Sequence, residues 1–145
     1  MELILWRHAD AEDGADDLAR KLTAKGEKQA ARVARWLRDH LPNEYTVLAS
    51  PAVRAQATAK ALGVAVNTAK ELAPGASPAA IIKAAGWPGR DDTVIIVGHQ
   101  PDLGRAVAQL VAHSRAEWLI RKGGLWWLAS EEPVRVRAVI SPDLL

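Results

Sequence analysis

Short, uninterrupted runs rich in Val, Ile and Leu constrain most strongly what this chain can fold into. Four such runs occur, at residues 3–6, 46–49, 93–97 and 125–129. None of them alternates apolar with polar residues, so each favours a strand that is covered on both faces, as in a parallel sheet between two layers of helices. Residues 134–139 do alternate, and they predict an edge strand with one face in water.

Helical patterns lie between these runs. Residues 23–41 carry apolar side chains at helical spacing, and a further helix is expected from Pro101 to Val111. Ser50-Pro51 and Ser77-Pro78 each join a capping side chain to a proline in the first helical turn. The alternation predicts an α/β fold, a three-layer sandwich whose mostly parallel central sheet has helices on both faces.

Composition excludes several classes of protein. At 145 residues without a repeat or linker, the chain is expected to form one domain, 1–145. It has no cysteine, which excludes disulfide scaffolds, thiolate metal sites and cysteine nucleophiles. The formal net charge of +2 gives no reason to expect nucleic acid as a partner. No apolar run is long enough to span a membrane and no signal peptide is recognisable, so we expect a cytoplasmic protein.

The charges are distributed unevenly near the N-terminus. Five acidic residues fall within residues 10–17, and seven basic residues follow within residues 20–38. The simpler interpretation is an acidic loop followed by a solvated helix face. The alternative is a docking surface for an acidic protein beside a charged active site.

Arginines and histidines follow three of the predicted strands. Arg7-His8 ends the first strand, Arg54 lies shortly after the second, and His99 follows the third. Ligands of open α/β sheets bind outside the carboxyl ends of the strands, so these side chains should meet at one edge. Two guanidinium groups match the oxygens of a phosphoryl group. One imidazole can attack phosphorus, and the other, when protonated, can donate to a phosphoryl oxygen. No metal is expected, because the histidines lack a partner one helical turn away and no suitable carboxylate pair accompanies them.

With these motifs the sequence resembles the histidine phosphatase superfamily, and within it the small SixA-type phosphohistidine phosphatases. The resemblance covers most of the chain in the family's order. It is carried by Arg7-His8-Ala9, Leu22 to Ala30, Ser50 to Ala55 with Thr58, and Gly98 to Pro101. It implies a minimal phosphoglycerate-mutase-like fold and a hydrolase that needs neither metal nor cofactor.

The resemblance also implies roles for individual residues. His8 would be the phosphorylated nucleophile, Arg7 and Arg54 would hold the phosphate, and His99 would complete the pocket. Arg20 resembles a further phosphate contact of the SixA type.

The proton donor has no confirming motif. Glu71 is the best-placed candidate, and Asp17 is the SixA-like alternative. Ala9 replaces the glycine that usually follows the catalytic histidine, and Ala57 stands where the family often has glutamine. We expect the backbone to adjust to Ala9 rather than the site to be lost.

The chemistry of the leaving group indicates the substrate. A phosphohistidine with its other ring nitrogen protonated expels a neutral imidazole, whose conjugate acid has a pKa of ~6.5, so it depends little on a general acid. We therefore expect hydrolysis of phosphohistidine on a phosphorylated protein such as a histidine phosphotransfer domain, through a covalent intermediate on His8. The alternatives are a phosphatase of a small phosphate ester and a phosphate-binding module without turnover. The sequence leaves the oligomeric state open.

Overall fold

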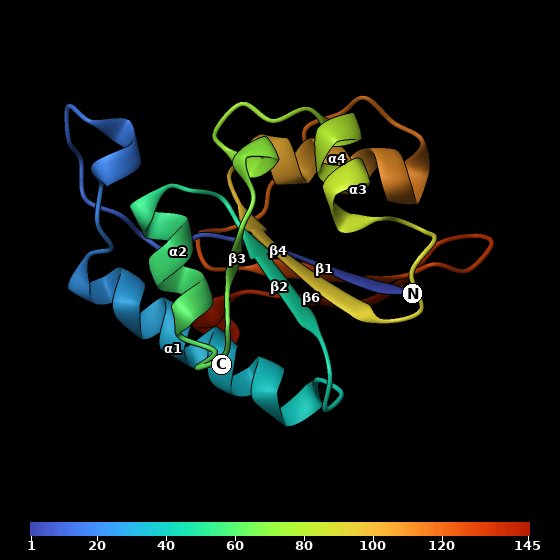
Figure 1. Ribbon diagram of the computed structural model, residues 1–145, viewed down its shortest axis with the longest axis horizontal. Coiled ribbons are helices and arrows are strands. Elements are labelled where there is room, and N and C mark those ends of the chain that lie inside the picture. Colours follow the sequence, from blue (N-terminus) through green and yellow to red (C-terminus); the bar gives the residue numbers. More distant parts are fainter.

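A computed structural model describes all residues, 1–145. Its six strands form one sheet in the order β3-β2-β4-β1-β5-β6 (Figure 1). The strands are β1 (Glu2–Arg7), β2 (Thr46–Ala49), β3 (Asn67–Thr68), β4 (Thr93–Gly98), β5 (Leu125–Ala129) and β6 (Arg135–Ile140). The pairs β1–β4, β4–β2 and β2–β3 are parallel, whereas β5 runs antiparallel to both β1 and β6. The prediction of a mostly parallel sheet is confirmed, and so is the edge position of β6.

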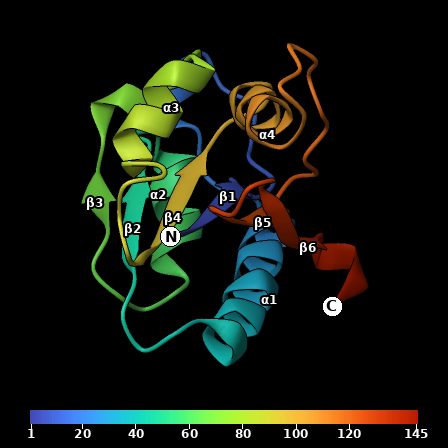
Figure 2. The ribbon, with the colours of Figure 1, turned by 90° about the vertical axis from the view of Figure 1, so that its right-hand side faces the viewer.

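Helices cover both faces of this sheet. They are α1 (Ala24–His40), α2 (Val53–Lys60), α3 (Pro78–Ala85) and α4 (Asp102–Ala112), with 3-10 turns η1 (Asp17–Ala19), η2 (Lys70–Leu72) and η3 (Pro142–Leu144). One hydrophobic cluster joins the sheet to α1 and α2, and a second joins it to α3 and α4. Figure 2 shows these two helical layers on opposite sides of the sheet. The three-layer prediction is therefore confirmed.

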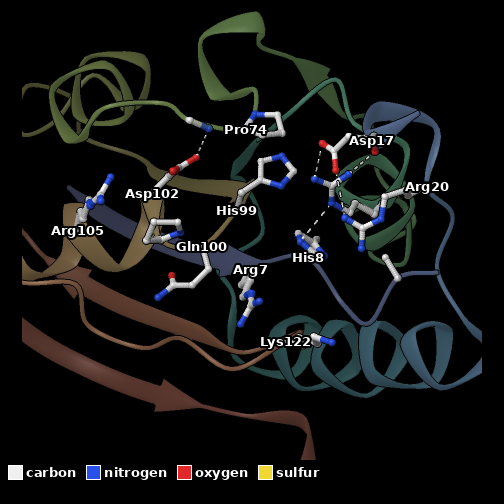
Figure 3. A pocket seen from close by; sticks show the side chains of 14 residues that line it. Arg7, His8, Asp17, Arg20, Pro74, His99, Gln100, Asp102, Arg105 and Lys122 are labelled. Atoms are coloured by element: carbon white, nitrogen blue, oxygen red, sulfur yellow. Dashed lines mark hydrogen bonds and ion pairs between the residues drawn. The ribbon is translucent and has the colours of Figure 1, made fainter. Parts of the chain in front are cut away.

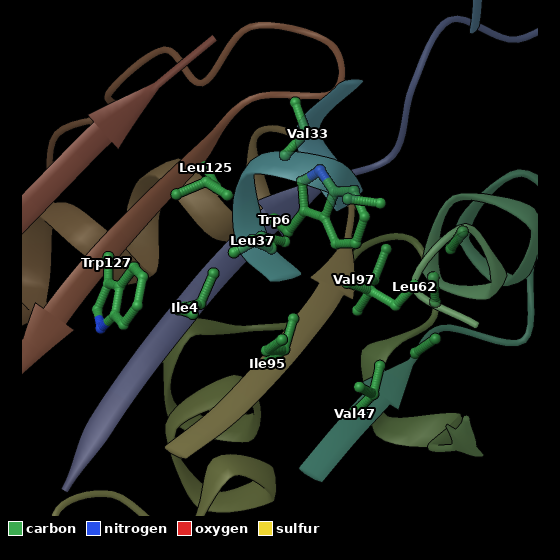
Figure 4. Close-up of a cluster of buried hydrophobic side chains, with 14 of the residues drawn as sticks. Ile4, Trp6, Val33, Leu37, Val47, Leu62, Ile95, Val97, Leu125 and Trp127 are labelled. Carbon is green, nitrogen blue, oxygen red and sulfur yellow. The ribbon is translucent and has the colours of Figure 1, made fainter. Parts of the chain in front are cut away.

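The central strand β1 shows why its uninterrupted apolar run is needed. Ile4 and Trp6 face the α1–α2 cluster (Figure 4). Leu3 and Leu5 face the cluster that joins the sheet to α3 and α4. All four side chains are fully buried. Burying one such side chain contributes about 1.5–3 kcal/mol, so both faces of the strand stabilise the fold.

The starts of the helices are as expected in most cases, with one correction. Thr23 Oγ1 accepts the Gly26 N–H at 3.0 Å to cap α1, and Ser77 Oγ accepts the Ala80 N–H at 3.1 Å to cap α3. The prediction that Ser50 caps the next helix is wrong, because α2 begins at Val53 and has no side-chain cap. Ser50 instead directly follows β2, where its hydroxyl faces a histidine.

Strand β3 and the 3-10 turns were not predicted, because two or three residues are too short for a periodic pattern. None of the helices combines the length and the apolar composition that crossing a membrane requires.

Candidate active site

The carboxyl ends of β1 and β4 hold the two histidines side by side. Arg7 pairs in register with Gly98, so the next residues, His8 and His99, emerge together. Their ring centroids are 5.3 Å apart, and the two side chains are largely buried. Arg54, in the first turn of α2, completes the group, and Figure 3 shows the two histidines of this group. The structure thus brings together the residues that the sequence analysis placed at one edge of the sheet.

These residues line a pocket of about 400 Å³ at that edge. Ten of its fourteen lining residues have polar or charged side chains. The lining residues are Arg7, His8, Ala11, Asp17, Arg20, Arg54, Pro74, Gly75, His99, Gln100, Pro101, Asp102, Arg105 and Lys122.

His8 presents an unprotonated nitrogen to the pocket. Its Nδ1 lies 2.7 Å from the carbonyl oxygen of Ala9, which can only accept, so Nδ1 carries the proton and Nε2 carries the lone pair. Arg54 Nε–H approaches this Nε2 at 3.4 Å. Burial, together with the neighbouring arginines and against the hydrogen bond to Ala9, lowers the pKa of His8 to about 4. The ring is therefore neutral at pH 7, as a nucleophile requires.

His99 presents an N–H to the same pocket. Its Nε2 lies 2.7 Å from Ser50 Oγ, and that oxygen also accepts the Ala52 N–H at 3.1 Å. The Ser50 hydroxyl contacts no other acceptor, so it donates to Nε2 and the ring proton lies on Nδ1. Burial and the nearby His8 lower the pKa of His99 to about 3, which keeps this ring neutral too.

Two residues that line the pocket each have a buried nitrogen without a hydrogen-bond partner: Arg7 Nε and His99 Nδ1. Arg7 is anchored through Nη1, which donates to the Ile120 carbonyl oxygen at 2.8 Å. Buried polar groups are normally satisfied, so unpartnered donors on adjacent strands indicate a place for an acceptor that the protein itself does not supply. A tetrahedral oxyanion fits this requirement.

Asp17 links two arginines of the pocket. Its carboxylate lies 3.1 Å from Arg20 Nη1 and 3.1 Å from Arg54 Nη2, and its carbonyl oxygen accepts from Arg54 Nη1 at 2.6 Å. The hydrogen bonds from Arg20 and then Arg54 hold the pKa of Asp17 below its usual value. In this arrangement Asp17 is an ionised anchor for the arginines, and it holds no proton to donate.

Glu71 does not lie in the pocket. Turn η2 points Leu72 into the core and leaves the Glu71 side chain exposed, outside the lining residues. Neither candidate for the proton donor is thus a protonated acid at the site.

Ala9 is accommodated without intruding on the site. Its side chain is fully buried in a small cluster with Leu22 and Ala30, on the side away from the pocket. Its N–H donates to Thr58 Oγ1 at 3.0 Å, and the Thr58 hydroxyl donates to the Arg54 carbonyl oxygen at 2.8 Å. Thr58 therefore ties the residue after His8 to the helix that carries Arg54.

Three residues that support the site were not predicted from the sequence, and Ser50 is one of them. The buried Asp102 accepts the N–H groups of Gly75 at 2.9 Å and Ala76 at 3.2 Å, and burial raises the pKa of its carboxyl. Gln100 accepts from Gly104 N at 3.0 Å and donates to a carbonyl of the following segment. Gln100 lies inside the Gly98–Pro101 motif, Asp102 directly follows it, and Ser50 begins the Ser50–Ala55 motif. These positions were the only signals in the sequence.

The molecule contains no group of three or more histidine, aspartate or glutamate side chains placed to hold a metal ion. The two imidazoles of the pocket are accompanied by guanidinium groups, which repel cations and bind anions.

Comparison with known proteins agrees with this anion-binding geometry. Residues 3–76 match the family model of the histidine phosphatase superfamily (branch 1). The phosphohistidine phosphatase SixA of Escherichia coli K12 is 31% identical over 120 residues, which cover 76% of this chain and 74% of the relative.

Solved structures show the same fold. A protein from Nakamurella multipartitia, proposed to be the phosphohistidine phosphatase SixA, superposes with a TM-score of 0.84 at 27% identity, covering 97% of this chain and 95% of that one. The protein histidine phosphatase SixA complexed with tungstate shares the fold, with a TM-score of 0.82 at 24% identity and 99% coverage of both chains. The chain therefore belongs to the histidine phosphatase superfamily and is a phosphatase homologous to SixA proteins.

Proposed function

We propose that the chain hydrolyses phosphohistidine on a phosphorylated protein through a covalent phosphohistidine intermediate on His8. One observation carries the proposal: the lone pair of His8 Nε2 faces a pocket in which Arg7 Nε and His99 Nδ1 are buried donors without a partner. The name of the Escherichia coli relative, a phosphohistidine phosphatase, supports the same reaction.

In the first step the phosphoryl oxygens accept hydrogen bonds from Arg7, Arg54 and His99. These bonds stabilise the negative charge on the phosphoryl group in the transition state. His8 Nε2 attacks phosphorus, and the bond from phosphorus to the substrate's ring nitrogen breaks. The substrate imidazole keeps that electron pair and leaves neutral, because its other nitrogen already carries a proton. The Ala9 carbonyl stabilises the positive charge that forms on His8 by accepting from Nδ1–H.

In the second step water attacks the phosphoryl group on His8. The bond from phosphorus to Nε2 breaks, the electron pair returns to Nε2, and both protons of the water leave with the phosphate. His8 regains its neutral form with the proton on Nδ1, so the site is ready for another turnover.

The state of the two predicted donors, Asp17 and Glu71, favours phosphohistidine over an alkyl phosphate ester. An alkoxide leaving group requires a proton from the enzyme, whereas a neutral imidazole does not. Asp17 is held ionised by two arginines, and Glu71 lies outside the pocket.

The test compares two substrates on the same enzyme preparation: a histidine phosphotransfer domain phosphorylated on histidine, and glucose 6-phosphate. We expect a kcat/KM at least about a hundredfold higher for the phosphoprotein, which corresponds to about 2.7 kcal/mol of selectivity. The variant His8→Asn should lose both activities. Equal or preferred turnover of the sugar phosphate would establish the small-ester alternative, and phosphate binding without turnover of either substrate would establish a binding module.

A further inference from the structure

A second hollow lies directly beside the catalytic pocket. It has a volume of about 380 Å³ and shares Arg7 and Lys122 with that pocket. Lys25, from the first turn of α1, and Arg121, from the segment before β5, line it as well. The two hollows are therefore neighbours, and both are lined by Arg7 and Lys122.

The second hollow carries an excess of positive charge. Lys25 and Arg121 have no ion-pair partner, whereas Lys122 pairs with Asp10 at 2.9 Å. Its one lining carboxylate, Asp143, accepts the Ser141 hydroxyl at 2.6 Å. Unpaired cations beside a phosphate pocket attract further negative charge on whatever enters that pocket.

An apolar hollow of about 180 Å³ lies next to the second, basic hollow, with which it shares Leu119 and Arg121. Three of its aliphatic side chains are unusually exposed: Leu119 at 71%, Leu144 at 75% and Val139 at 50%. Exposed aliphatic residues that gather in one place mark a surface for another protein.

The loop between His8 and η1 carries the reverse charge. Glu12, Asp13 and Asp16 are exposed in the loop that leads from His8 to η1. This loop repels the carboxylates that the basic hollow attracts, so the two surfaces together favour one orientation of an acidic ligand.

We propose that the basic and apolar hollows form a docking surface for the segment of the protein substrate that flanks its phosphorylated histidine. The segment carries carboxylates next to the phosphohistidine and aliphatic side chains beyond them. This inference rests on the proposed function and specifies its substrate. A small phosphate ester would fill the catalytic pocket alone, whereas the charge and the apolar extension of this surface fit a polypeptide.

The test uses two synthetic peptides of equal length, each with one phosphohistidine and the same leucines, flanked by aspartates in one and by lysines in the other. We expect wild-type kcat/KM to be about tenfold higher for the acidic peptide at low ionic strength, and high salt to reduce this ratio. The double variant Lys25→Glu/Arg121→Glu should abolish or invert the preference, while its hydrolysis of phosphoramidate stays at the wild-type rate.

A matched control reverses two charges at a distance from the site. Arg32→Glu/Arg35→Glu changes the net charge equally, on an exposed part of α1 outside both hollows. It should keep the wild-type preference for the acidic peptide. Equal kcat/KM for the two peptides, or an equal loss of preference in this control, would overturn the docking surface.

Binding separates this inference from the proposed function. Fluorescence anisotropy with His8→Asn, which lacks the nucleophile, reports the affinity for each labelled phosphopeptide without turnover. Tighter binding of the acidic peptide by His8→Asn, together with no hydrolysis of either peptide by the wild type, would retain the docking surface and refute the proposed reaction. Equal binding of both peptides would refute the docking surface whatever the hydrolysis result.

Discussion

At the scale of the residue, the two imidazoles of the site have the same tautomer and face the pocket with opposite ends. His8 donates a hydrogen bond from Nδ1 to the Ala9 carbonyl oxygen, so the lone pair of its ring lies on Nε2. His99 receives a hydrogen bond from Ser50 and turns an N–H to the pocket. The groups behind the rings therefore decide which one can attack and which one can hold an oxyanion.

Ser50→Ala tests this assignment. The substitution removes the donor to His99 Nε2, so the ring proton is free to move away from the pocket, and we expect kcat/KM for phosphoramidate to fall about tenfold. Nitrogen NMR of the imidazole should show His99 shifting towards the Nε2–H tautomer. Ser77→Ala, which removes the cap of α3 and leaves the contact between Ser50 and His99 intact, should lower stability without changing either readout. An unchanged His99 tautomer in Ser50→Ala would contradict the role assigned to Ser50.

Glu71→Gln tests the proton donor at the same scale. Because the Glu71 side chain is exposed and outside the pocket, we expect kcat on the phosphorylated phosphotransfer domain to stay within about twofold of the wild type. The measurement is steady-state kinetics across pH. Loss of a basic limb from the pH profile, with a large fall in kcat, would show that Glu71 reaches the leaving group during the reaction.

At the scale of the element, α4 and the segment before β5 are in close contact behind the site. A Cβ on Gly104 would lie 1.8 Å from the Trp118 carbonyl oxygen, and Gln100 Nε2 donates to that oxygen at 2.6 Å. The same segment supplies the Ile120 carbonyl that anchors Arg7. The absence of a side chain at Gly104 therefore helps to position Arg7 in the pocket.

Gly104→Ala should push this segment away from α4. We expect a loss of about 1–3 kcal/mol of unfolding free energy and a rise in KM, because the backbone carbonyl cannot give way as a side chain can. Thermal unfolding and steady-state kinetics measure the two effects. Gly89→Ala is the control, since its Cβ would make only an ordinary contact at 3.6 Å. Wild-type stability and KM in Gly104→Ala would contradict this close contact.

The elements themselves were largely predictable from the sequence, and the contacts between them were not. Apolar runs and alternation predicted the longer strands, helical spacing predicted α1 and α4, and the Ser-Pro pairs predicted α2 and α3, because burial and helix starts leave local patterns. The Ser50 cap was predicted wrongly, because the hydroxyl bonds to a histidine 49 residues away rather than to its own helix. The supporting roles of Asp102 and Gln100 were not predicted for the same reason. Tertiary packing determines their hydrogen-bond partners, and no local sequence pattern indicates it.

At the scale of the whole molecule, the site combines groups from distant parts of the chain because parallel strands end at one edge of the sheet. The cost is that two imidazoles lie in a largely buried, cationic place. Their pKa values in the folded protein, about 4 for His8 and about 3 for His99, lie below the ordinary 6.5. Folding therefore opposes the protonation of both rings.

This opposition makes stability depend on pH in a definite direction. Below pH 6.5 the two histidines bind protons in the unfolded chain but stay neutral in the folded protein. The free energy of unfolding therefore decreases as the pH falls towards 4. Each histidine contributes a slope of up to about 1.4 kcal/mol per pH unit in this window. Urea unfolding between pH 7 and 5 should show stability falling with acidification, and the fall should be shallower in His8→Asn/His99→Asn. Equal slopes in the two proteins would contradict the burial of neutral imidazoles.

The formation of a bond between phosphorus and His8 is the event on which the proposed reaction depends. Rapid quenching of the enzyme during turnover of phosphoramidate, followed by mass spectrometry under alkaline conditions that preserve phosphohistidine, detects that bond directly. We predict one acid-labile phosphoryl group on the peptide that contains His8, formed and lost fast enough to account for turnover and missing in His8→Asn. Turnover without phosphate on His8, or full activity in His8→Asn, would contradict the account.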